Sequence, residues 1–135
     1  MRRILSLLLL AVVVLGVGFY FYQRNIAPIP VAAADLEKGG AFSDGEKTAL
    51  TAACSATVKK DTATVCGCIA GKAATDLSRF ERMMATASFQ GKLSDVVGIT
   101  KGLIDSGIPA AKVKAAESDA KTRFSDLTKS CGATQ

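Results

Sequence analysis

The sequence predicts an all-α protein: a single apolar N-terminal helix, followed by a small bundle of about five short helices stapled by disulfide bonds. Apolar residues recur at helical spacing through the C-terminal part of the chain, and no segment has the two-residue period of a strand. Two Ser-x-x-Glu capping boxes and a Gly–Pro break mark helix ends. Four cysteines, enough for two cross-links, all lie in this C-terminal part.

An uncharged apolar run extends from Ile4 to Tyr22. A helix over these residues is about 28 Å long, close to the ~30 Å hydrocarbon core of a bilayer. Arginines precede the run, and aromatic residues followed by Arg24 end it, as at a membrane interface. We therefore expect residues 1–24 to form an uncleaved membrane anchor. The alternative is a cleaved secretory signal, which would release a secreted protein.

The distribution of charge predicts how the chain is oriented. Arg2 and Arg3 before the apolar run favour a cytosolic N-terminus, and an even set of cysteines is typical of an oxidising compartment. We expect a single-pass protein of a bacterial inner membrane whose C-terminal domain lies in the periplasm. Three of the 17 Lys and Arg flank the anchor, which leaves 14 against 12 acidic residues, a net charge of +2. So small a charge predicts no nucleic-acid partner.

Beyond the anchor, we expect a linker and one domain. Residues 25–40 contain two prolines and a Gly-Gly pair without apolar periodicity, which predicts a flexible linker. The helical domain then covers residues 41–135. Its expected helices run over 44–59, from 61 or 62 to 75 or 76, from the second capping box at Ser78, over 95–106, and from Pro109 to about Cys131.

The cysteine spacing predicts the disulfide pairing. On a helix, Cys66 and Cys68 are about 200° apart, so their sulfurs need different partners. A helical hairpin centred on Asp61 places residues 54 and 68 at equal distances from the turn. This predicts Cys54–Cys68 and Cys66–Cys131, and the alternative is Cys54–Cys66 with Cys68–Cys131.

Two further patterns have a structural and a functional interpretation. Phe80, Met83, Met84 and Phe89 follow helical spacing, which favours core packing, and the alternative is an exposed docking surface for a partner. The small-x-x-x-small pattern in residues 98–102 is typical of close helix contact, but it is a weak indication outside a bilayer.

The residue inventory narrows the function. The chain has no His, which excludes His-ligated haem, His-containing zinc sites and imidazole catalysis. We predict no catalytic, metal or cofactor residues, and a non-catalytic accessory subunit whose partners are the bilayer and another membrane-associated protein. The alternative is a periplasmic thiol-redox or metal-handling protein that uses Cys66 and Cys68, with Met83 and Met84 as soft copper ligands.

Overall fold

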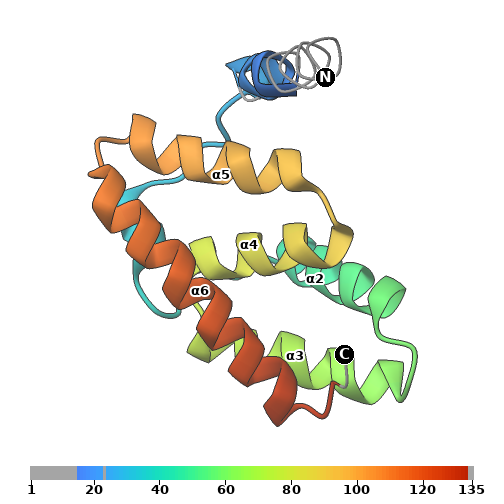
Figure 1. The fold of residues 1–135 in the computed structure, drawn as a ribbon. Coiled ribbons are helices and arrows are strands. Elements are labelled where there is room, and N and C mark those ends of the chain that lie inside the picture. Colours follow the sequence, from blue (N-terminus) through green and yellow to red (C-terminus); the bar gives the residue numbers. More distant parts are fainter. Residues whose placement is uncertain (1–14, 23, 134–135) are drawn as a thin grey trace, which may run out of the picture.

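The structure, a computed structural model, describes residues 15–22 and 24–133. Its described part is all-helical, as predicted, apart from one isolated bridge between Lys38 and Ser78. The N-terminal helix covers residues 15–22 and 24–25. It is followed by the 3-10 helix η1 (Ala33–Leu36) and five α-helices: α2 (Asp44–Thr57), α3 (Thr62–Asp76), α4 (Arg79–Gln90), α5 (Leu93–Asp105) and α6 (Ala110–Ser130) (Figure 1).

Both predicted capping boxes begin helices. At α2, the Ser43 hydroxyl accepts a hydrogen bond from the Glu46 amide, and the Glu46 carboxylate accepts one from the Ser43 amide. Ser78 and Glu81 make the same reciprocal pair at α4. These bonds satisfy amide groups that a helix start would leave without partners. By contrast, α5 begins at Leu93, two residues before the predicted start, without a side-chain cap.

Helix α4 lies in the middle of the bundle, with α5 on one side and α2 and α3 on the other (Figure 1). Its side chains enter two apolar clusters. The first joins α4 to α2, α3 and α6, and the second joins it to α5, α6 and the chain before α2. The first includes Leu50, Ile69, Leu77, Ala85 and Leu127; the second includes Val31, Phe80, Met84, Ile99 and Leu103.

The segment over residues 26–42, which we call the strap, packs along the bundle. The Ile29 amide donates to the Gly98 carbonyl at 2.9 Å, and the Lys101 ammonium donates to the Ile26 carbonyl at 3.0 Å. Val31 is 95% buried in the second cluster. We predicted a flexible linker over residues 25–40. The strap is instead packed on the bundle, because its apolar side chains have a docking site on α5.

That docking site depends on two glycines. A Cβ atom on Gly98 would lie 3.0 Å from the Ala27 carbonyl oxygen, and one on Gly102 would overlap the Ile29 carbonyl. The small-x-x-x-small pattern of α5 thus lets the backbone of the strap, rather than another helix, approach closely.

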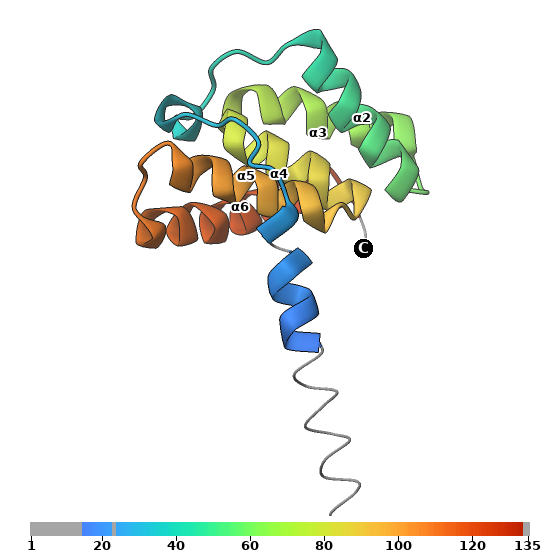
Figure 2. The same ribbon diagram turned by 90° about the horizontal axis from the view of Figure 1, so that it is seen from above.

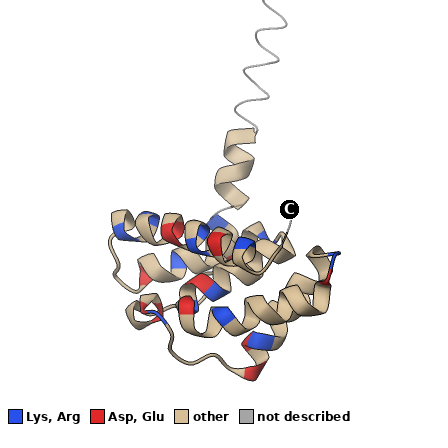
Figure 3. Ribbon diagram, turned by 90° about the horizontal axis from the view of Figure 1, so that it is seen from below, with Lys and Arg blue, Asp and Glu red and all other residues tan. Residues whose placement is uncertain are grey.

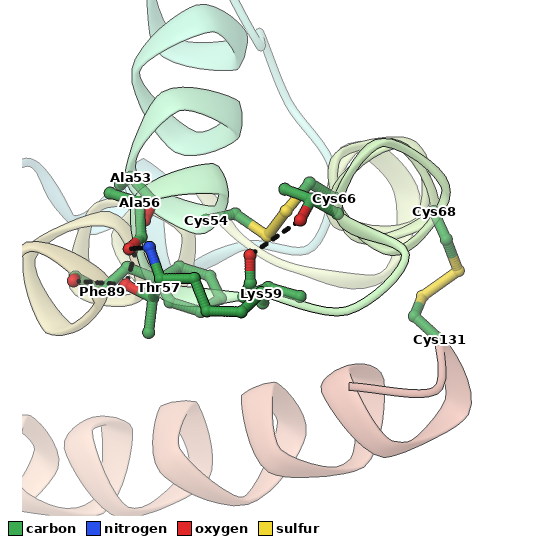
Figure 4. Close-up of a disulfide and its surroundings, with 11 residues drawn as sticks. Ala53, Cys54, Ala56, Thr57, Lys59, Cys66, Cys68, Phe89 and Cys131 are labelled. Carbon is green, nitrogen blue, oxygen red and sulfur yellow. Dashed lines mark hydrogen bonds between the residues drawn. A yellow bond between two sulfur atoms is a disulfide. The ribbon is translucent and has the colours of Figure 1, made fainter. Parts of the chain in front are cut away.

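The two disulfides join Cys54 to Cys66 and Cys68 to Cys131 (Figure 4). Cys66 and Cys68 lie on opposite sides of α3 and have different partners, as predicted. The predicted pairing of Cys54 with Cys68 and of Cys66 with Cys131 is wrong, because Asp61 is not the centre of the turn.

The actual turn explains the pairing. Helix α2 ends at Thr57, two residues earlier than expected, and Asp61 is the N-cap of α3 with a left-handed φ of 49°. The connection is therefore centred near Lys60. Residues 54 and 66 are equidistant from that centre.

The predicted membrane anchor is described only in part. Residues 4–14 of the apolar run lie outside the described part of the chain. Within the described residues, none of the helices combines the length and the apolar character that crossing a bilayer requires.

Replacing Cys131 by Ser should free a single thiol, that of Cys68. The chain-entropy model assigns about 4 kcal/mol to the 63-residue loop that this bond closes, so urea unfolding should show a loss of that order. Cys68 is half-buried, whereas Cys66 is 99% buried. Maleimide should therefore label Cys68 without denaturant; a label that appears on Cys66 would contradict the observed pairing.

Replacing Gly102 by Ala should destabilise the fold by about 2–3 kcal/mol, because the new methyl group overlaps the Ile29 backbone and the strap must shift away from α5. The control is Gly71→Ala in α3, where a Cβ atom meets nothing within 4 Å. Removing that exposed helical glycine should stabilise the protein by about 0.5–1 kcal/mol. Urea unfolding of the full chain in detergent compares the two, and equal shifts would show that the strap is not docked.

Candidate binding groove

A groove of about 290 Å³ runs over α4, between α2 on one side and α5 with the strap on the other. Buried and half-buried apolar side chains line most of its floor, and polar side chains other than the buried Arg82 line its rim. The apolar residues are Ile29, Phe42, Ala49, Met83, Ala87 and Ile99, and the polar ones are Glu46, Arg79, Arg82, Thr86, Gln90 and Asp95.

One face of α4 supplies half of this lining. Its contributing residues are spaced by three or four positions, from Arg79 to Gln90, so they follow a single stripe along the helix. Adjacent faces of the same helix bury Phe80 and Met84 in the second cluster and Ala85 in the first. The groove therefore lies directly on the most central element of the fold.

Arg82 is buried beneath the groove, where its guanidinium binds backbone carbonyls. It is 98% buried, and its guanidinium donates to the carbonyls of Ala41 at 2.7 Å, Leu77 at 3.0 Å and Gly39 at 3.1 Å. Its Cζ lies 4.5 Å from the centre of the Phe42 ring, within the range of a cation–π contact. Burial lowers the pKa of Arg82 from its ordinary value. Within the described residues, its Nε has no partner.

An ionic cluster forms one end of the groove. The Arg79 guanidinium contacts the carboxylate of Glu46 at 2.8 Å and that of Asp35 at 3.3 Å. Partial burial alone would raise the pKa of Glu46, but the hydrogen bonds from Arg79 and Ser43 outweigh it and lower that pKa. The hydrogen bond with Glu46 raises the pKa of Arg79. These contacts join α4 to both η1 and α2.

The other end is formed by Gln90 at the end of α4 and Asp95 in the first turn of α5. Asp95 is half-buried, and within the described part of the chain its carboxylate has no hydrogen-bond or ion-pair partner. A basic or amide group in the groove therefore has an acceptor at this end.

The aromatic and Met residues singled out from the sequence do not form one surface. Phe80 and Met84 are buried, so they cannot dock a partner. Phe89 packs edge-to-face on Phe124, with ring centres 5.0 Å apart. Met83 alone lines the groove.

The sequence interpretation missed the three residues that shape the groove, Phe42, Arg79 and Arg82. The helical spacing of Arg79, Arg82 and Met83 could have indicated the part of the groove lining that α4 contributes. Phe42 lies outside any regular element, and its pairing with Arg82 across 40 positions had no local indication.

Cys66 and Cys68, which the alternative redox interpretation uses, are not a pair of free thiols and are not bonded to each other. Each is bonded to a cysteine of another helix or helix end, and no described cysteine is free. Within the described residues, no group of three or more Cys, Asp or Glu side chains has a metal-binding arrangement.

Comparison with known proteins gives no relative: no protein-family model, no curated protein and no solved structure matches this chain.

Arg79→Gln should raise the pKa of Glu46 towards its ordinary value of 4.5, because the charged hydrogen-bond donor is lost. The lowered folded-state pKa means that ionised Glu46 stabilises the fold fully above 4.5, and that this stabilisation is lost as pH falls through the folded-state value. NMR titration of the carboxyl carbon measures the pKa. Below pH 4.5, the free energy of unfolding of the wild type should fall more steeply than that of Glu46→Gln. If the free energies of unfolding of the two proteins change in parallel with pH, the ion pair is contradicted.

Proposed function

We propose that this protein is a membrane-anchored, non-catalytic accessory subunit whose groove over α4 binds an apolar segment of another membrane-associated protein. The observation that carries the proposal is the lining of the groove, an apolar floor closed at each end by polar groups. Ligand and peptide sites have this composition, with few polar groups that fix orientation.

The size and charge of the groove indicate which kind of molecule it binds. Its volume of about 290 Å³ lies at the lower end of the range for small-molecule sites. This favours a few side chains of a peptide segment over a large cofactor. The Asp95 carboxylate at one end favours a segment with a basic residue beside its apolar ones.

The floor of the groove is fixed before binding. Arg82 positions Phe42 through a buried stack and the strap through backbone carbonyls. A preformed site loses little conformational freedom when a partner binds, so a small contact area is sufficient.

The apolar run from Ile4 to Tyr22 supports the anchoring part of the proposal. Anchoring the subunit and its partner in one membrane raises their effective concentration, which compensates for a small groove. The two arginines before the run favour a periplasmic domain in a bacterial inner membrane.

Site-specific photocrosslinking in membranes tests the groove. A photoreactive residue at Gln90, on the rim, should give a defined protein adduct, and one at Thr48, on the exposed side of α2, should not. Met83→Glu introduces a charge into the apolar floor and should reduce the Gln90 adduct about tenfold or more. Unchanged helicity by circular dichroism controls for folding.

Two outcomes would contradict the proposal. One is an adduct from Gln90 that survives Met83→Glu, because the groove would then not be the binding surface. The other is a protein that stays monomeric in mild detergent and gives no adduct from either position.

A further inference from the structure

The exposed large apolar side chains of the described residues lie on only two elements. Six are on the N-terminal helix, between Leu15 and Tyr22. The other two are Leu93 and Ile104, which are 59% and 47% exposed, and both lie on α5. Two elements far apart in sequence thus share a property that the rest of the described surface lacks.

The exposed apolar residues of α5 form a stripe. Exposed Leu93 and Ile104 share one helical face with half-buried Val97, because the three are separated by four and seven positions. Ile99 and Leu103 occupy a different face and are buried in the second cluster. We call Leu93, Val97 and Ile104 the α5 stripe; its side chains do not contribute to the core.

The N-terminal helix joins the bundle at α5. The ammonium of half-buried Lys101 on α5 donates to the carbonyl of Ile26, just after the N-terminal helix. One turn earlier on α5, the Gly98 carbonyl accepts a hydrogen bond from the Ile29 amide. The end of the apolar run is therefore held at the helix that carries the stripe.

The distance from the apolar run to α5 is short. Ile26 follows Tyr22 by four residues, about 6 Å along a helix. The polar interfacial layer on each side of a bilayer is about 5–8 Å thick. If Tyr22 ends the membrane-spanning run, Lys101 lies within that layer.

The arrangement of the helices agrees with this placement. In Figure 2 the N-terminal helix stands out from the side of the bundle that carries α5 and α6, crosswise to α5, and α2 lies on the opposite side. In the view of Figure 3, Lys and Arg are interspersed with Asp and Glu along the helices of the bundle. General attraction of the domain to anionic lipid therefore does not determine which face turns to the membrane.

We propose that the α5 stripe rests in the interfacial layer of the bilayer that the N-terminal helix enters, as a second membrane contact. This inference rests on the anchoring part of the proposed function. Apolar side chains on a helix that lies in the membrane plane bind the headgroup–acyl boundary. Exposed Lys92, the N-cap of α5, is a cation that can reach the headgroups, while exposed Asp105 at the other end limits the attraction to anionic lipid.

The contact orients the groove. The groove is bounded by α5 on one side and by α2 on the other. With α5 at the bilayer, one rim lies at the membrane surface, and a partner segment that emerges from the same membrane reaches the groove alongside α5.

Single-Trp variants test the contact, because the chain contains no Trp. The full-length variants Leu93→Trp, Ile104→Trp and Thr48→Trp are reconstituted into phosphatidylcholine vesicles with or without bromine atoms on the upper acyl chains. All three positions are exposed on the bundle, so each should accept the larger side chain. Flotation of the vesicles reports anchoring independently of fluorescence.

The stripe variants should show blue-shifted emission and quenching by bromine about threefold stronger than that of Thr48→Trp. Flotation with equal quenching at all three positions would overturn the bilayer contact and leave anchoring intact. Blue-shifted stripe emission without bromine quenching would mean that a protein covers the stripe and would also overturn it. Failure to float would overturn anchoring and, with it, this inference.

Discussion

The buried guanidinium of Arg82 is the interaction on which the rest of the structure depends. A buried charge is costly unless hydrogen bonds and polarisable groups replace its water. Here the carbonyls of the strap and of the α3 end accept hydrogen bonds from its N–H groups, and the Phe42 ring covers its face. The fork geometry matters, because a lysine ammonium could not serve these separate carbonyls and stack on the ring together. One side chain of α4 thereby fixes the strap, the α3–α4 corner and the floor of the groove.

The strap adds apolar side chains to a domain that has few large ones: residues 41–135 contain 20 Ile, Leu, Val, Phe and Met among 95 residues. Ile29, Val31 and Leu36 all contact the second cluster, although they precede the boundary that the sequence indicates at residue 41. Small domains bury a limited fraction of their surface, so even a few added apolar side chains matter. The glycines of α5 make the addition possible, because the strap then approaches at backbone distance. The strap is thus part of the folded unit.

Features that depend on neighbouring residues could be predicted from the sequence, whereas contacts between residues far apart in the chain could not. The Ser43 and Ser78 capping boxes and the opposed directions of Cys66 and Cys68 depend on neighbouring residues, and these predictions were correct. The start of α5 also depends on neighbouring residues, but it was predicted two residues too late. The disulfide pairing failed because it depends on the centre of a turn, and a displacement of about one residue changes the partner. The strap was misjudged because prolines and glycines indicate irregular chain, whether or not that chain is docked. Arg82 was missed because its acceptors are backbone carbonyls, which have no sequence pattern.

The two ends of the bundle are held together by different means. Around α3, the two disulfides bind α2 and the end of α6, so that end stays assembled when weaker contacts break. Helix α5 has no covalent cross-link and is held by Ile99, Leu103 and the strap. On the proposed placement, this less restrained helix is the one that meets the bilayer. A force or lipid change that shifts α5 then acts first on the strap and on the groove between α5 and α2, while the cross-linked end remains unchanged. Coupling of this kind needs only that both events share the α5–strap contact.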